Sequence, residues 1–486
     1  MQFKLDILSK EEINQIHSAS LQVLSKAGMR FDSEKLIQGL KKRGAKIDES
    51  KHTAIIPDDV VENAIENNRR LIQSGKKLHL LNGVTSSLSE ENRIEAKISG
   101  ACDKYLDWKT QQIKKADSKE LLNYIRLGEK IPEVDFVGNA IVMNYDLDGK
   151  EIDGRLKRIK TAALIAKHTR KTGSVTVWDA DEIDFLVDIG IVAKGSKERY
   201  YKEPCFISAK ETISPLYLDE NSGNILLEFA KRELPCTILP MPITGVSSPV
   251  TRLGNAIVGN AEILGVITAI QSVCPEAPVG GGTISGIMDM QTSVTSFSAP
   301  EAILQDIAIA EVHAKLYGFD YLIGTGYTDA KYPNSQVLAE KTMKYLLTFL
   351  SGRYTYPLGL LNGGSIFSGE QALVDLEICR YIHSHFGNFG NFDQIQELAE
   401  TITSVGIRGH YISEDHTLLH FRENWFPQIL DRTSFKSIEE NKDRDIYNNA
   451  HQRVSQLLSS NDFYEIDGDR AKEIDSIIKK AEKTLL

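Results

Sequence analysis

The sequence predicts an α/β protein whose core is a TIM (β/α)8 barrel, with helices and short strands before the barrel and helices after it. From about residue 118, short apolar runs alternate with amphipathic helical segments, a pattern typical of parallel strands covered by helices. Seven such runs favour a barrel over an open doubly wound sheet. The chain also lacks both the GxGxxG turn of dinucleotide-binding sheets and the GxxxxGK[ST] phosphate loop.

The N-terminal region predicts three helices followed by short strands. The first, "SKEEINQIHSASLQVLSKAG", opens with a capping box of Ser9 and Glu12 and ends at Gly28. The second is "DSEKLIQGLKKRGA", and the third follows Pro57 as "DDVVENAIENN". Short β runs come next, including "RIEAKISGACDKYLDW". We assign residues 1–115 to this N-terminal decoration.

The barrel is expected over residues 116–430. Its predicted strands are "DFVGNAIVM", "SVTVWD", "CFISA", "PCTILPM", "PVGGGTI", "YLIGTG" and "YPLGLLNGG". Helical segments such as "GRLKRIKTAALIAKHTR" and "NSGNILLEFAKREL" separate them. A weaker eighth strand is "GHYIS", at residues 409–413. The polar, helical residues 431–486 predict a C-terminal appendage.

Composition places the chain among soluble globular proteins and excludes several functions. Hydrophobic residues make up 41% and charged residues 26%. With 57 basic and 67 acidic residues the net charge is −10, so we expect neither nucleic-acid nor membrane binding. The first residues carry charges where a signal peptide needs an apolar centre. Five scattered cysteines without a CxxC motif predict a cytoplasmic protein.

Several segments together resemble the trimethylamine methyltransferase family. They are "IHSASLQVLSKAGMRF", "IPDDVVENAI", "PITGVSSPVTRLGNAIVGNAEILGVITAIQ", "GTGYTDAKYPNSQVLAEKT" and "GHYISEDHTLLHFRENWFPQILDR". The resemblance extends over nearly the whole chain. It implies a TIM barrel and an enzyme that transfers a methyl group from a methylated amine to the Co(I) corrinoid of a separate corrinoid protein.

One departure from the family pattern narrows the expected substrate. Family members that act on trimethylamine carry pyrrolysine, whereas this chain consists only of standard residues. It therefore resembles the non-pyrrolysine branch, which implies a quaternary amine as methyl donor. Glycine betaine is the preferred candidate, and proline betaine, carnitine and butyrobetaine are alternatives. We expect the position that replaces pyrrolysine to lie between Gly324 and Gly364.

The chemistry of a quaternary amine explains why no special residue is needed. Its nitrogen is already cationic, so the methyl group leaves behind a neutral tertiary amine once it is aligned with a strong nucleophile. The chain has no DxHxxG cobalamin motif, which predicts that it binds no cofactor itself and that the corrinoid arrives on its partner protein. We also expect a homo-oligomer.

Barrel enzymes carry their chemistry at the C-terminal ends of the strands, and we select candidate site residues there. Aromatic rings hold quaternary ammonium groups, and carboxylates offset their charge. We predict catalytic roles for Glu211 and Asp329. Substrate-binding candidates comprise five aromatic residues and four cations for a substrate carboxylate: Tyr145, Trp178, Tyr327, Tyr356, Phe367, Lys210, Lys331, Arg353 and His410.

Other motifs have simpler explanations. The glycine runs "PVGGGTISG" and "LLNGG" could cradle a phosphate, but tight turns at strand ends account for them better. His416 and His420 lie four residues apart without a third ligand, so we predict no metal site. Two functions stay open as alternatives: a barrel that uses a folate methyl donor, and a protein that binds quaternary ammonium without transferring its methyl group.

Overall fold

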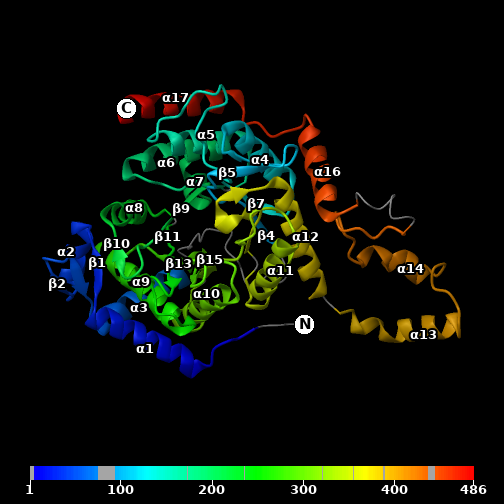
Figure 1. Ribbon diagram of the computed structural model, residues 1–486, viewed down its shortest axis with the longest axis horizontal. Helices are drawn as coiled ribbons and strands as arrows, with labels where there is room; N and C mark the ends of the chain where they lie inside the picture. The colour runs from blue at the N-terminus through cyan, green and yellow to red at the C-terminus, as the bar shows by residue number, and fades with distance from the viewer. Residues whose placement is uncertain are drawn as a thin grey trace.

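The protein is an α/β structure with parallel strands at its centre and helices around them (Figure 1). It is seen here in a computed structural model. The structure describes residues 5–74, 94–171, 173–234, 236–319, 321–353, 355–386, 389–435 and 444–486.

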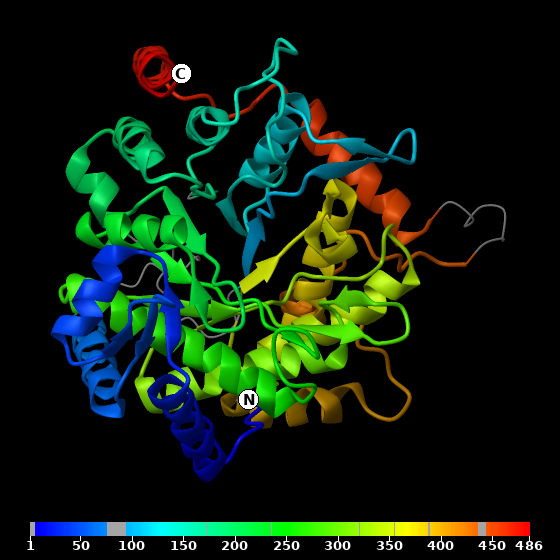
Figure 2. The ribbon, with the colours of Figure 1, turned by 60° about the vertical axis from the view of Figure 1, so that its left-hand side comes forward.

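The N-terminal region forms the three predicted helices and a small sheet. The helices are α1 (Lys10–Lys26), α2 (Glu34–Lys42) and α3 (Asp58–Gln73). The predicted capping box is present: Ser9 Oγ accepts the Glu12 backbone N–H at 3.2 Å, and the Glu12 carboxylate accepts the Ser9 N–H at 2.7 Å. The sheet has the order β10-β1-β3-β2, with bounds Tyr217–Leu218, Met29–Phe31, Thr53–Ile55 and Lys46–Asp48. All three helices pack against the long helix α9 (Arg252–Val273), as the blue and green segments in Figure 2 show.

Two parallel sheets form the centre. The first has the order β16-β13-β11-β9-β8, with bounds Tyr321–Ile323, Gly280–Thr283, Cys236–Ile238, Phe206–Lys210 and Gly173–Ser174. The second has the order β17-β4-β7, with bounds Thr355–Pro357, Glu95–Ile98 and Val134–Val137. Each strand is followed along the chain by a helix: α4 (Ser118–Lys130), α5 (Lys157–His168), α6 (Ile183–Lys194), α8 (Glu220–Lys231), α9, α10 (Pro300–Val312), α11 (Ser335–Leu350) and α12 (Gly369–His385).

The two sheets adjoin each other at both of their edges. Beside β7 and β8, the Asn139 N–H donates to the Ser174 carbonyl at 3.2 Å. Beside β16 and β17, Thr325 Oγ1 donates to the Thr355 carbonyl at 3.3 Å. Within the described residues, the strand ladders stop at these edges and do not themselves close a barrel. The structure therefore shows the predicted α/β fold with its parallel strands, but not the closure of a TIM barrel.

The eighth parallel strand is not where the sequence placed it. The seven apolar runs all contain strands of the two sheets, but residues 409–413 form no strand, so that prediction is wrong. The eighth strand is β4, which lies between β17 and β7. Its sequence "EAKI" carries charges at Glu95 and Lys97, and a search for apolar runs therefore misses it.

Helix α9 is the one described helix that is long and apolar enough to cross a membrane. Most of the helix is buried inside the protein. The apolar character of α9 is therefore explained by its neighbours α1, α2, α3 and α10, which cover it.

A buried ion pair joins the helices α11 and α12. Lys341 Nζ lies 2.6 Å from Asp375 Oδ2, and both side chains have no exposed surface. The same carboxylate accepts the Gly359 N–H at 2.7 Å and Gln371 Nε2 at 2.8 Å. Burial lowers the pKa of Lys341 and raises that of Asp375. The pair thus depends on both partners being present.

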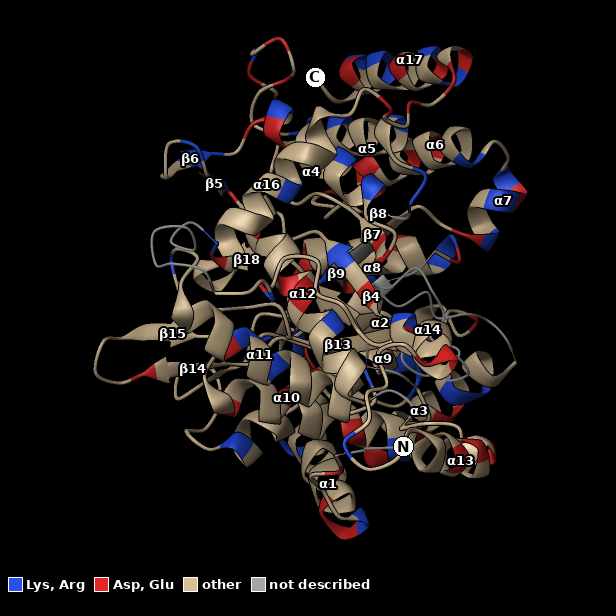
Figure 3. Cartoon of the chain, turned by 90° about the vertical axis from the view of Figure 1, so that its right-hand side faces the viewer, with Lys and Arg blue, Asp and Glu red and all other residues tan. Residues whose placement is uncertain are grey.

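The C-terminal region is helical, as predicted, and its two parts differ in packing. Helices α16 (Ile446–Ser459) and α17 (Gly468–Leu485) lie against the body next to α12, α4, α5 and α6. Acidic and basic residues are interspersed along the outer side of α17 (Figure 3). Helices α13 (Ile395–Val405) and α14 (Asp415–His420) instead extend away from the body (Figure 1).

Candidate active site

The C-terminal ends of β13 and β16 are fastened together by one carboxylate. Asp306 of α10 is 1% exposed and accepts the backbone N–H groups of Ser285 and Gly324, each at 2.9 Å. A Cβ atom on Gly324 would lie 3.0 Å from Asp306 Oδ2, so glycine leaves room for this contact. Asp306 thereby fixes the loop that carries Tyr327 and Asp329.

We expect Asp306 to make stability depend on pH. Burial raises its pKa to about 6, above the usual range of an aspartic acid. A carboxyl with a raised pKa favours the folded state at low pH, and this contribution is lost as the pH rises from about 4 to about 6. The loss amounts to about 3 kcal/mol. Urea unfolding from pH 4 to 7 should show this decline in the natural protein and not in Asp306→Asn; equal slopes would contradict it.

Tyr327 lies at the centre of a small group of side chains beyond the end of β16. Its half-buried ring faces Phe297, with ring centroids 5.6 Å apart and planes at 39°. Lys344 Nζ lies 5.8 Å from the ring centroid and donates to the Phe297 carbonyl at 2.6 Å. Burial raises the pKa of the Tyr327 phenol, and the fields of Cys102, Glu211 and Asp306 add smaller contributions in that order. The two predicted residues Tyr327 and Glu211 are therefore electrostatic neighbours.

Strand register explains why Glu211 faces this group. Lys210 pairs with Ile238, and Ile238 pairs with Gly281, so these three lie on the same face of the sheet. A Cβ on Gly281 would lie 3.2 Å from Ile263 of α9, which identifies this face as the helix-covered one. Because successive residues of an extended chain alternate, the half-buried Glu211 points to the opposite face.

The residues on either side of Glu211 agree with this alternation. Lys210 is buried and donates to the Val177 carbonyl at 3.3 Å. Thr212 is also buried and donates to the carboxylate of Glu262, which belongs to α9. Lys210 is thus bound on the helix side of the sheet, away from Tyr327.

Phe297 was not among the predicted site residues. It follows β15 (Val294–Ser296), the second strand of a hairpin with β14 (Gly286–Asp289), and so it is not at the end of a central strand. The candidate residues were selected only at the C-terminal ends of the predicted central strands, and this selection cannot include Phe297. The one available signal was a further segment that resembles the trimethylamine methyltransferase family, "APEA" at residues 299–302, which begins two residues after Phe297.

Asp329 is held in the loop after β16 by hydrogen bonds of both its side chain and its backbone. Its carboxylate accepts the hydroxyl of Ser296, and its backbone N–H donates to Ser298 at 3.2 Å and to Glu340 at 3.0 Å. Lys331 is exposed and donates to the backbone carbonyl of Asp329 at 2.8 Å, rather than to its carboxylate. These contacts hold the loop next to Phe297.

Two other predicted aromatic residues are exposed at the surface. Tyr145 is exposed and forms an isolated bridge with Glu151. Trp178 is 63% exposed, and the guanidinium of Arg158 lies 3.8 Å from its ring centroid. The accessible ring of Trp178 thus already binds one cation of the protein itself.

Besides Lys210, four further predicted residues are not brought to Tyr327. Tyr356 and Phe367 are 0% exposed: the Tyr356 hydroxyl lies 2.9 Å from His383 Nε2 of α12, and Phe367 packs on Tyr124 of α4. Arg353 precedes β17 and donates to the Tyr321 carbonyl at 3.2 Å, at the N-terminal ends of the strands. His410 is exposed in the segment between α13 and α14.

Lys97 is a second residue that the sequence analysis missed. It is 6% exposed and stands opposite Phe136 and Pro357, with its Nζ 5.3 Å from the Phe136 ring centroid. Its neighbour Ala96 pairs with Tyr356, which faces the helices, so Lys97 lies on the opposite, inner face. Burial lowers its pKa to about 7. The alternating charges in "RIEAKI" were the signal for an amphipathic central strand.

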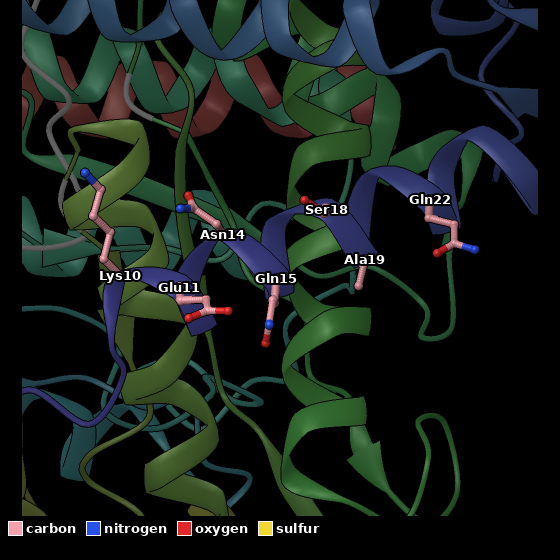
Figure 4. A pocket seen from close by; sticks show the side chains of 7 residues that line it. All are labelled: Lys10, Glu11, Asn14, Gln15, Ser18, Ala19 and Gln22. Carbon is pink, nitrogen blue, oxygen red and sulfur yellow. The ribbon is translucent and has the colours of Figure 1, made fainter.

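Two other features of the described residues, the histidines of α14 and a hollow on α1, have simpler explanations. Across the described ranges, no cluster of three or more His, Cys, Asp and Glu residues could hold a metal ion. His416 and His420 do share helix α14, but His420 pairs with Glu423 at 2.7 Å. A hollow on α1 is lined by a single exposed helix face (Figure 4), whose residues are Lys10, Glu11, Asn14, Gln15, Ser18, Ala19 and Gln22.

The close approach at Gly326 gives a direct test of the geometry beneath Tyr327. A Cβ on Gly326 would lie 2.6 Å from both the Cβ and the carbonyl oxygen of Pro357 in β17. Gly326→Ala should therefore lower the free energy of unfolding by about 1–3 kcal/mol in urea titrations. Gly154→Ala is the matched control, because no atom of the described residues lies within 4 Å of its Cβ position. Equal effects of both changes would contradict the placement.

Comparison with known proteins assigns the chain to a class of methyltransferases. The trimethylamine methyltransferase (MTTB) family matches residues 2–485, and the chain belongs to this family. A trimethylamine methyltransferase of Methanosarcina barkeri is 26% identical over 99% of this chain and 96% of its own length. A glycine betaine methyltransferase of Desulfitobacterium hafniense is 24% identical over 94% of this chain and 93% of its own. The solved Methanosarcina barkeri monomethylamine methyltransferase matches with a TM-score of 0.46 and 10% identity over 97% of both chains.

Proposed function

We propose that the protein transfers a methyl group from a quaternary amine, preferably glycine betaine, to the Co(I) corrinoid of a separate corrinoid protein, and releases dimethylglycine. Membership of the methyltransferase family supports methyl transfer. The observation that carries the choice of substrate is the pair of aromatic rings Tyr327 and Phe297, 5.6 Å apart, with Glu211 on the inner face of the sheet as the predicted carboxylate that acts on Tyr327. Aromatic faces and a nearby negative charge are what a trimethylammonium group binds.

The arrangement suits a reaction that needs positioning more than proton transfer. The methyl carbon forms its new bond with the two electrons of the nucleophilic Co(I), while the electron pair of the breaking C–N bond stays on nitrogen. The amine leaves neutral, so no acid is required. Tyr327 and Phe297 would orient the ammonium group, and Glu211 would balance its charge. The absence of pyrrolysine from the chain fits a donor that is already cationic.

The fold proposal follows from the edges of the two sheets. We infer that they form one (β/α)8 barrel, because Asn139, just after β7, donates to Ser174 of β8, and the side chain of Thr325, just after β16, donates to Thr355 of β17. The strand β4 then belongs to the barrel, and the boundary of the N-terminal decoration moves from residue 115 to the start of β4, near residue 94. We further propose a cytoplasmic enzyme, in accord with its composition.

The function is tested with the purified protein and reduced corrinoid protein. Glycine betaine, proline betaine, carnitine, butyrobetaine and trimethylamine are each supplied, and the demethylated product is measured. We expect stoichiometric dimethylglycine from glycine betaine. If no quaternary amine loses a methyl group, the proposal is overturned. Product from trimethylamine alone would instead assign to this chain the activity named for its Methanosarcina barkeri relative.

Binding experiments separate the remaining alternatives. A ligand at about 100 times its Kd stabilises a protein by about 2.7 kcal/mol, which a thermal-shift screen detects. Stabilisation by glycine betaine without product formation would indicate a binding protein that has lost transfer. Binding of methyl-tetrahydrofolate in the absence of corrinoid protein would indicate the folate-dependent alternative.

A further inference from the structure

Residues 389–426 form an arm that packs poorly on its own chain. The arm contains α13, α14 and the short turns at Phe392–Gln394 and Phe421–Glu423, and none of these four elements has a buried residue. It extends beyond the rest of the molecule at the right of Figure 1. A segment of this kind gains little stability from its own chain.

The arm nevertheless carries many large apolar side chains, of the kind usually found in a protein core. Eleven of its large apolar residues are exposed, among them Phe392 at 70%, Ile407 at 99%, Ile412 at 87% and Leu418 at 68%. Together they present roughly 1,000 Å² of apolar surface. Single exposed apolar residues are common on a protein surface, but so many on one short segment are typical of an interaction site. The arm therefore requires a partner surface.

The arm is held at its base, which distinguishes it from a loose tail. The Glu377 carboxylate of α12 accepts the backbone N–H groups of Gln428 at 2.8 Å and Ile429 at 3.2 Å. The ring of Trp425 packs on Tyr381 of the same helix, with centroids 5.4 Å apart. These contacts present the arm in a defined direction.

The charges of the arm argue against a membrane as its partner. Helices that lie on membranes carry Lys and Arg on their polar face. Helix α13 carries Glu397 and Glu400 and has neither Lys nor Arg. An anionic lipid surface would repel it.

We propose that the arm packs against a second copy of this chain. When two copies bury their arms reciprocally, the buried surface reaches roughly 2,000 Å², in the range of permanent homodimers. A corrinoid protein, as the exchanging partner of the function proposed above, must bind and leave, and such encounters bury less surface. A second copy, by contrast, is always present at the concentration of the first. A closed symmetric assembly covers every arm.

The test measures the molar mass of the full chain by light scattering and sedimentation. One chain weighs 54.2 kDa, and we expect the natural protein to have at least twice this mass at micromolar concentration. The variant Ile402→Glu with Leu418→Glu should shift to a single chain. The control Val246→Glu with Met290→Glu changes two apolar residues of the body that are 61% and 62% exposed, similar to the arm residues, and should keep the larger mass.

Hydrogen exchange of the natural protein gives a second readout that does not depend on the folding of a variant. Amides of α13 and α14 should be protected in the assembled protein and exchange faster when it is diluted to single chains. A single-chain mass for the natural protein, an assembly unaffected by the arm variant, or equal dissociation of the control overturns the proposal. Protection of the arm only after corrinoid protein is added also overturns it.

Discussion

Glu211→Gln is expected to weaken the binding of glycine betaine by about 2 kcal/mol, or about 30-fold in Kd. The change keeps the size of the side chain and removes its charge. Loss of one partner from a fully buried charge pair costs about 2–5 kcal/mol, and Glu211 is half-buried, which places the effect at the lower end. Methyl transfer at low substrate concentration should fall by a similar factor.

Calorimetry with a neutral isostere distinguishes charge from shape. In 3,3-dimethylbutanoate a carbon atom replaces the ammonium nitrogen of glycine betaine. We expect Glu211→Gln to weaken glycine betaine binding while leaving the weak binding of the isostere unchanged. The exposed Glu233 provides the control substitution Glu233→Gln, which removes the same charge elsewhere on the surface. An equal loss for both ligands would show that Glu211 acts through packing and would contradict its electrostatic role.

Asp375→Leu is expected to lower the free energy of unfolding by about 3–5 kcal/mol. The change leaves the ammonium of Lys341 buried without its partner, and it removes the acceptor of the Gly359 and Gln371 hydrogen bonds. The double variant Lys341→Met with Asp375→Leu should recover much of this loss, because an apolar pair of similar volume has no charge to desolvate. Urea titrations of the two single variants and the double variant measure the coupling between the residues.

An ion pair at the protein surface, Lys167 with Asp475, is the control for the buried pair of Lys341 and Asp375. Lys167 and Asp475 lie 2.6 Å apart with side chains 21% and 53% exposed. Asp475→Asn should change stability by less than about 1 kcal/mol. If Asp375→Leu has no larger effect than this control, or if the double variant is as unstable as the sum of the single variants, the buried pair does not stabilise the fold as described.

The sequence predicted the central strands that are buried on both faces and therefore apolar along their whole length. All seven strands recognised from apolar runs are present, since a strand covered on both faces must be apolar along its length. The strand β4 escaped because its inner face carries Glu95 and Lys97. The pairing partners of β4 make it a central strand. They are Thr355–Pro357 and Val134–Val137, which are distant from β4 in the sequence.

The candidate site was predicted in part, for a geometric reason. Strand ends locate Glu211 and Tyr327, because parallel strands bring their C-terminal ends to the same edge. The sequence does not tell which face a side chain takes, so the buried Tyr356 and Phe367 looked as suitable as Tyr327. Phe297 reaches the ring from a hairpin, and such a contact follows from the tertiary structure alone.

The pairing of β4 with β17 has a consequence for how the chain folds as it is synthesised. The five strands from β8 to β16 lie within one continuous stretch, so their sheet can assemble as soon as this stretch has emerged. The second sheet must wait, because Thr355 Oγ1 bonds Glu95 across 260 residues. Until then β4 lacks its neighbour β17 on one side, and an unpaired strand edge invites pairing with other chains. Nascent chains that stop before β17 should therefore be the most prone to aggregate.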